Sequence, residues 1–156
     1  MARLALALIL LTGCGLVSKD FVVAKDFQAG GGAPPFTGSF DSSTLTSSFS
    51  ADVSKISSIT LTAARIEATD GKDLSFVSGA TISISAANNI LPTALLAKLA
   101  APAPAGATSV ELAVTGKELK PYLQANGTIS AGIDYNPTPV TARTLKLVLT
   151  LHGSLF

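Results

Sequence analysis

Apolar and polar residues alternate one by one over much of this chain, which is the pattern of β-strands that bury one face. The clearest segment is Ile56–Thr69, where Ile59 and Leu61 fall on one face. Ala63-Ala64 then shifts the count by one residue, and Ile66 continues the apolar face. Because side chains in a strand alternate with a period of two, this shift predicts a β-bulge.

Further segments with the same character predict strands or extended chain along the rest of the sequence. They are Phe21–Phe27, Phe36–Ser50, Ala80–Ala86, Ser109–Thr115, Thr128–Tyr135 and Thr144–Phe156. In the last of them every second residue from Leu145 to Leu151 is leucine. A run of this length and regularity predicts a central strand.

The segment Ile90–Ala101 fits two patterns. Leu91, Leu95 and Leu99 lie at helical spacing, and alanine, leucine and lysine favour a helix. Leu95, Ala97 and Leu99 also fall on one face of a strand. Because predicted strands lie on both sides, the context favours a strand paired in a hairpin, and a helix is the alternative.

Two short helical turns are predicted between the strands. Ser50–Lys55 forms one turn with Ser50 as its N-cap. Lys117–Ala125 places Leu119 and Leu123 at helical spacing. We expect this second turn to close one open end of the sheets.

Glycine, proline and asparagine separate the predicted strands, as they do in turns and loops. These breaks are Gln28–Pro35, Asp70–Asp73, Asn88-Asn89, Ala101–Gly106, Asn126-Gly127 and Asn136–Pro139. Several short strands with turns between them and little helix predict an all-β fold, an antiparallel β-sandwich with one or two short helical turns. Its length indicates a single domain over residues 21–156.

Composition excludes some classes of partner. The formal net charge is +1 and charged residues make up 13% of the chain, against about 25% in a typical soluble domain. Such a surface has no basic footprint for phosphate backbones, so we expect no nucleic-acid binding. The chain has no tryptophan and only 6% aromatic residues, which argues against an aromatic platform for stacking sugars.

The first residues have the parts of a secretory signal peptide. Arg3 supplies a positive charge, Leu4–Leu11 is an apolar run, and the small residues Thr12 and Gly13 lead to Cys14. The apolar run is too short to span a bilayer, which takes about 20 residues. These parts together predict a secretory signal peptide.

The tetrapeptide Leu11-Thr12-Gly13-Cys14 resembles the lipobox of bacterial lipoproteins, and Cys14 is the only cysteine in the chain. The resemblance implies that residues 1–13 are a signal peptide that is removed, and that Cys14 is the lipidation site and carries palmitate or similar acyl chains. Residues 14–20 would then form a lipidated tether. In such lipoproteins an aspartate directly after the cysteine favours retention at the inner membrane. Gly15 stands at that position, so the resemblance implies a periplasmic location at the outer membrane. The alternative is an ordinary signal peptide that contains a cysteine. The remaining chain loosely resembles small lipoprotein β-sandwich domains of unassigned function.

Few residues carry chemistry. His152 is the only histidine, and it alternates with the leucine row, so we expect it to face outward into solvent. With Cys14 lipidated, the chain has one histidine and no free cysteine, which excludes most zinc sites. Asp70 and Asp73 place two carboxylates in a turn without the acidic spacing of an EF-hand, so a plain turn is favoured over a calcium site. No catalytic, cofactor-binding or metal-binding residue is predicted.

These observations favour a non-enzymatic binding or structural module, lipid-anchored in the bacterial cell envelope. Its expected partners are the membrane, through the lipid on Cys14, and an envelope protein. The alternative is a carrier that holds a lipid or acyl chain between the sheets. A third hypothesis, a small hydrolase, requires His152 beside an acid and a serine in a cleft.

Overall fold

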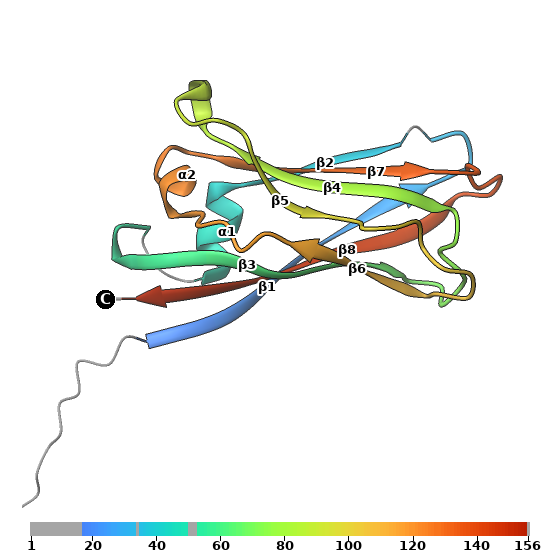
Figure 1. Cartoon of the computed structure of the whole chain (residues 1–156), viewed down its shortest axis with the longest axis horizontal. Coiled ribbons are helices and arrows are strands. Elements are labelled where there is room, and N and C mark those ends of the chain that lie inside the picture. The colour runs from blue at the N-terminus through green and yellow to red at the C-terminus, as the bar shows by residue number, and fades with distance from the viewer. Residues whose placement is uncertain (1–16, 34, 50–52, 156) are drawn as a thin grey trace, which may run out of the picture.

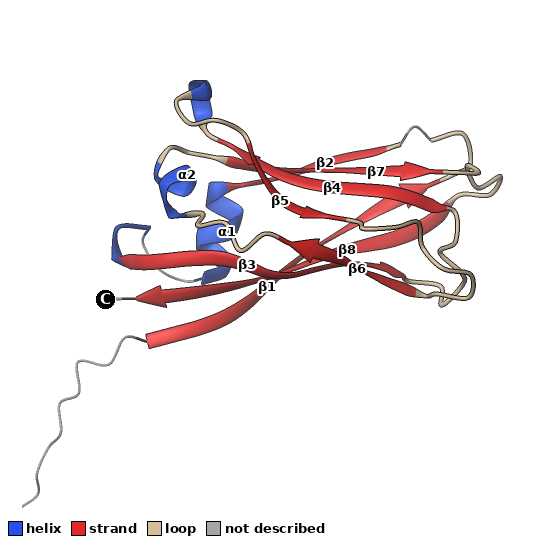
Figure 2. Cartoon of the chain, in the orientation of Figure 1, coloured by secondary structure: helices blue, strands red, loops and turns tan. Residues whose placement is uncertain are grey.

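Strands make up most of the chain that the structure describes. The computed structural model describes residues 17–33, 35–49 and 53–155. Its strands are β1 (Val17–Ala29), β2 (Phe36–Asp41), β3 (Ile56–Ala68), β4 (Val77–Ser85), β5 (Ala94–Lys98), β6 (Ser109–Val114), β7 (Thr128–Tyr135) and β8 (Arg143–Leu155). Helices α1 (Ser42–Phe49) and α2 (Lys120–Gln124) and 3₁₀ turns at Val53–Lys55 and Ala87–Asn89 lie between them. The predicted all-β fold with short helical turns is confirmed (Figure 2).

The strands form two antiparallel layers (Figure 1). Sheet A has the order β1-β8-β3-β6, and sheet B has the order β5-β4-β7-β2. The two sheets are joined at one corner, where Ala97 and Lys98 of β5 pair with Val114 and Ala113 of β6. Elsewhere they face each other as a sandwich, with β8 in the interior of sheet A as its leucine row predicts.

The opposite edges of the two sheets, β1 and β2, meet at a seam without a strand ladder among the described residues. The rings of Phe27 and Phe36 stack there with their centroids 4.2 Å apart. Lys25 reaches across and donates from Nζ to the main-chain oxygen of Ser39 at 3.2 Å. Side chains thus nearly close the sandwich along this seam.

The core lies between the sheets and follows from the alternation of the strands. Leu145, Leu147, Leu149 and Leu151 of β8 are fully buried. They belong to one continuous apolar cluster to which all eight strands contribute. Burying such side chains contributes about 1.5–3 kcal/mol each, and this is the main stabilisation available to a chain without a disulfide.

The structure confirms the predicted bulge and the predicted hairpin. Against β8, the register of β3 shifts between Leu61 and Ala63, so that both Leu61 and Ala64 are buried. Ala94–Lys98 is a strand that pairs with β4, rather than a helix. Asn88 and Asn89 in the connecting turn have positive φ values of 56° and 53°.

The prediction of extended chain over Phe36–Ser50 is correct for β2 and wrong after it, because Ser42–Phe49 is helix α1. Asp41 ends the strand and caps the helix, since its carboxylate accepts a hydrogen bond from the main-chain N–H of Thr44 at 2.7 Å. That N–H holds the pKa of Asp41 below its usual value. Leu45, fully buried, fixes the helix to the core.

The two predicted helical turns have different outcomes. Lys120–Gln124 forms α2, whose Tyr122 and Leu123 are buried at one end of the sandwich. The other prediction is met in part by the 3₁₀ turn Val53–Lys55, and its N-cap Ser50 lies outside the described residues. In the part of the chain that the structure describes, no helix has the length and apolar character needed to cross a membrane.

β1 begins and β8 ends at the same end of the sandwich, near α1 and α2 (Figure 1). The connections β1–β2, β3–β4, β5–β6 and β7–β8 gather at the opposite end. We call this opposite end the loop end.

Candidate functional site

The predicted lipidation site, Cys14, lies outside the described residues. The predicted tether over residues 14–20 is wrong for residues 17–20, which belong to β1 and pair with β8 from Val17 opposite Leu155. The reason is that β8 extends far enough to pair with them. Residues 18–20 are polar, so no apolar alternation marks this part of the strand in the sequence. Only Gly15 and Leu16 therefore separate Cys14 from the first strand.

His152 faces outward from sheet A, as predicted, and it has a carboxylate beside it. Asp20 lies opposite it on β1, with its Oδ1 2.6 Å from Nδ1 of the imidazole. Thr60 of β3 lies on its other side. Asp20 could not be recognised as this partner from the sequence, because it falls within the predicted tether.

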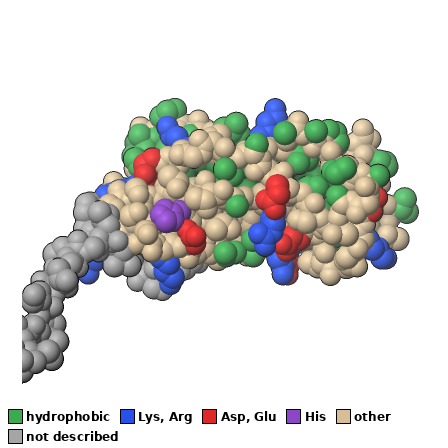
Figure 3. All heavy atoms as spheres, turned by 60° about the horizontal axis from the view of Figure 1, so that its bottom comes forward, with side chains coloured by type: hydrophobic (Ala, Val, Ile, Leu, Met, Phe, Trp, Pro, Cys, Tyr) green, Lys and Arg blue, Asp and Glu red, His purple; other side chains and the backbone are tan. Residues whose placement is uncertain are grey.

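The His152–Asp20 pair lies on an open face. The side chains are 42% and 67% exposed, and Figure 3 shows the histidine on the surface of this face. Neither of the two hollows described below includes these residues. The acid that a hydrolase needs is present, and the pair bridges edge strand β1 and β8 at a position that water reaches freely.

The Asp70–Asp73 turn, considered for calcium, is occupied by protein groups. Arg143 donates from Nε to Oδ2 of Asp70 at 3.0 Å and from its second terminal nitrogen to Oδ1 at 2.8 Å. These hydrogen bonds lower the pKa of Asp70 to about 2. Asp73 accepts a hydrogen bond from the main-chain N–H of Ser75 at 2.7 Å, which lowers its pKa as well. Among the described residues, no three acidic, histidine or cysteine side chains gather as a metal site would require.

An open hollow of about 460 Å³ lies on the outer face of sheet B. We call it the sheet B hollow. Its side chains are short and mostly hydroxylated, and they come from β2, β4 and β7: Thr37, Ser39, Thr81, Ser83 and Ser130, with Gly132 among them. In the sequence these residues stand only as the polar positions of alternating strands.

Strand register arranges the hydroxyl groups of the sheet B hollow in rows. Ser39, Ser130 and Ser83 pair across three neighbouring strands and form one row. In the next row Gly132 stands between a threonine of β2 and a threonine of β4. Side chains opposite each other in such rows have Cβ atoms about 4.5–5.5 Å apart, and successive rows lie about 6.8 Å apart along the strands.

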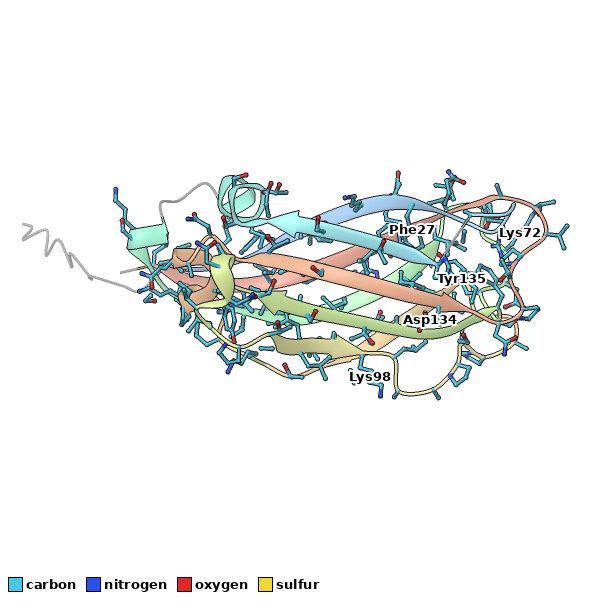
Figure 4. All side chains as sticks on the ribbon, turned by 90° about the horizontal axis from the view of Figure 1, so that it is seen from above. Phe27, Lys72, Lys98, Asp134 and Tyr135 are labelled. Carbon is cyan, nitrogen blue, oxygen red and sulfur yellow. The ribbon has the colours of Figure 1, made fainter. Side chains whose placement is uncertain are left out.

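Charged side chains surround the sheet B hollow without lining it. Asp41 follows Ser39 by two residues on β2, and Asp134 follows Gly132 by two residues on β7, so both carboxylates flank the rows. Lys98 of β5 pairs with β4 beside Thr81. Figure 4 shows Asp134 and Lys98 on their separate strands of this sheet.

A second hollow, of about 290 Å³, lies where β5 and β6 diverge beyond their shared corner. It is lined by residues 99–104 and 109–111. This second hollow borders the core, because Leu99, Ala103 and Val110 of its lining belong to the buried apolar cluster.

No protein-family model and no curated protein matches this chain. Among solved structures, the chain is similar to a chain of turnip yellow mosaic virus, with 11% identity and a TM-score of 0.40. The match covers 99% of this chain and 89% of the viral chain. At that TM-score the similarity carries no argument about function.

Proposed function

We propose that this protein is a bacterial lipoprotein, a β-sandwich held at the outer membrane by acyl chains on Cys14, that acts as a non-enzymatic binding module. The observation that carries the proposal is the position of the lipobox-like sequence Leu11-Thr12-Gly13-Cys14, which ends three residues before β1. A leader placed there can be removed without loss of any residue of the described sandwich.

The short spacing has a geometric consequence for an anchored protein. Two residues, Gly15 and Leu16, span at most about 7 Å when extended. The end of the sandwich where β1 begins would therefore lie at the membrane surface, and the loop end would face away from it. Two or more acyl chains are needed to hold such a domain stably, because a single chain binds reversibly.

The binding role is supported by what the described surface offers. Its one histidine–carboxylate pair is open to water, and its turn carboxylates are held by protein partners. The sheet B hollow, by contrast, presents several short polar side chains in one place. A face of this kind suits recognition more than proton transfer or nucleophilic attack.

Labelling with a palmitate analogue tests the anchor directly. Cells that express the wild-type chain or Cys14→Ala are labelled, and their inner and outer membranes are separated on a density gradient. We expect label on the wild-type protein alone, in the outer membrane, and release of the variant from the membrane fraction. Equal labelling of both proteins, or of neither, would contradict the proposal.

A further inference from the structure

Gly132 is a strand residue whose identity the described chain does not itself explain. Its φ lies outside the left-handed region, and a Cβ added to it would meet no atom within 4 Å. Gly38 and Gly127 differ, since the ring of Phe36 and the carbonyl oxygen of Tyr122 occupy the space of their missing side chains. Glycine weakens a strand interior, and it is found where a ligand or another backbone approaches closely. The backbone of β7 is therefore open at Gly132 to close approach by another molecule.

The hydroxyl groups around Gly132 are available to such an occupant. Within the described residues, the side-chain hydroxyls of Thr37, Ser39, Thr81, Ser83 and Ser130 have no hydrogen-bond partner in the protein. Other surface hydroxyls are used internally: those of Thr69 and Thr115, for example, donate to main-chain carbonyl oxygens at 2.6 and 2.9 Å. The sheet B hollow thus gathers hydroxyls that can each donate and accept hydrogen bonds.

The charges near the sheet B hollow indicate an uncharged occupant. Among the described residues that line it none is charged, and the flanking residues Asp41 and Asp134 are both acidic. The two carboxylates are offset by two ammonium groups, because Lys98 pairs opposite Thr81 and Lys25 donates to the main-chain oxygen of Ser39 at 3.2 Å. Neither sign of charge prevails around the hollow, so it favours neither an anion nor a cation. A cation or an anion inside would also lose hydration without gaining a partner of opposite charge.

We propose that the sheet B hollow binds an uncharged, polyhydroxylated chain, a glycan, whose hydroxyl groups exchange hydrogen bonds with the serine and threonine rows. The volume of about 460 Å³ lies within the range of small-molecule sites, about 300–1,000 Å³. Gly132 lets a sugar ring approach the backbone of β7. No aromatic side chain is among the described residues that line the hollow, so hydrogen bonding takes the place of ring stacking. The proposal gives a ligand class to the binding role proposed above, and it does not depend on the anchor at Cys14.

Binding at one hollow should be weak. Neutral hydrogen bonds add little net free energy, because each replaces a hydrogen bond to water. We therefore expect a dissociation constant of about 1 mM for a single chain. Many copies held in one membrane would bind a long glycan far more tightly, because each later contact is intramolecular.

The test uses the full-length chain, labelled with nitrogen-15 and purified in an amine oxide detergent that carries no sugar. Chitohexaose, cellohexaose and maltohexaose are titrated separately, with hexagalacturonate as the charged comparison. We expect at least one uncharged hexasaccharide to shift the amide signals of Thr81, Ser130 and Gly132, and hexagalacturonate to leave them unchanged. The proposal is overturned if all three uncharged sugars leave these signals unmoved, or if hexagalacturonate binds as well as they do.

Variants separate this site from an unspecific effect. Gly132→Thr places a side chain in the hollow, where a Cβ meets no atom within 4 Å. It should lower the affinity at least about tenfold, with a melting temperature no lower than wild type. Ala24→Thr adds the same side chain on the outer face of sheet A and should change nothing. A double Ser39→Ala, Ser130→Ala variant removes hydroxyls without filling the hollow and should also weaken binding. Full affinity in either hollow variant contradicts the proposal.

A second copy of the chain could occupy the sheet B hollow in place of a sugar. Sedimentation of wild type and Gly132→Thr over a range of concentrations detects such self-association. Self-association that Gly132→Thr abolishes, without sugar binding, would show that the face pairs two copies and would overturn the glycan proposal. Failure of sugar binding leaves the palmitate result intact, and failure of labelling leaves the sugar titration intact, so the two proposals fall separately.

Discussion

Arg143 shows how this chain uses one of its few charged residues. Its guanidinium forms two hydrogen bonds with the carboxylate of Asp70 and lies 5.1 Å from the ring centroid of Phe76. Two parallel hydrogen bonds fix the orientation of both groups, and the aromatic face adds a cation–π contact. The side chain is only 13% exposed. Arg143 therefore fastens the turn after β3 to the start of β8 at the loop end.

Replacing Arg143 with methionine should change how stability depends on pH. The pKa of Asp70 is about 2 in the folded chain, against an ordinary value of 3.8. A lowered folded-state pKa adds stability that is fully present above about pH 4 and is lost as the pH falls through about 2. We expect the urea midpoint of the wild type to fall more steeply over this range than that of Arg143→Met.

Arg65→Met is the matched control for this experiment. Arg65 pairs with Glu67 on the same strand, and both side chains are about one-third exposed. Exposed pairs of this kind contribute little. The control should retain the wild-type acid profile, and an unchanged profile in Arg143→Met would contradict the role given to Asp70.

Gly127 is a second residue whose replacement has a clear structural consequence. A Cβ at this position would lie 2.6 Å from the carbonyl oxygen of Tyr122 and 3.0 Å from that of Ser85. Both atoms are backbone and belong to α2 and β4, so neither moves easily. We expect Gly127→Ala to cost about 1–3 kcal/mol in the free energy of unfolding, measured by urea titration. Gly132→Ala, with open space around it, should stay within about 0.5 kcal/mol of wild type, and equal losses in the two variants would contradict this account.

At the level of elements, period-two alternation was sufficient for most strands. The strands β3, β4, β6, β7 and β8 follow the predicted segments closely, because each buries one face against the opposite sheet. Helix α1 was missed because serine and threonine fill it and give no apolar stripe beyond Leu45 and Phe49. What decides its conformation is the cap at Asp41 and the burial of Leu45, and neither is visible as a period.

The bulge in β3 leads to a deletion experiment. Leu61 and Ala64 are an odd number of positions apart, so plain alternation would place them on opposite faces of β3. Both are nevertheless buried, because the bulge lies between them. Removing Thr62 would restore plain alternation, with Leu61, Ala64 and Ile66 still facing inward. We expect this deletion variant to fold with a modest loss of stability, measured by circular dichroism and thermal unfolding.

Deletion of Ser83 is the comparison for the bulge. It would bring Ile82 and Ile84 of β4 into consecutive positions, so that one of these two buried side chains must face solvent. We expect this variant not to fold. If deletion of Thr62 is as damaging as deletion of Ser83, the bulge has a role beyond absorbing one extra residue.

At the level of the whole molecule, the arrangement of strands makes the candidate site. The sheet B hollow combines residues near positions 38, 82 and 131, which come together only because β2, β7 and β4 are neighbours in sheet B. A single sequence contains the alternation within each strand but not the order or register of strands distant along the chain. For the same reason Asp20 and His152, 132 residues apart, could not be paired in advance.

The same strand order predicts which parts of the molecule open first. β8 is paired with β1 and β3 over nearly its whole length, and Leu147 and Leu149 are fully buried. β2 has six residues, pairs with β7 alone, and meets β1 through side chains at the seam. We expect native-state hydrogen exchange to show β8 amides opening only with global unfolding and β2 amides exchanging at least about tenfold faster through local opening. Phe36→Leu, which removes the ring stack with Phe27, should speed exchange in β2 and leave β8 unchanged. Exchange of β2 at the rate of β8 would instead mean that the seam holds the two edges as firmly as a strand ladder does.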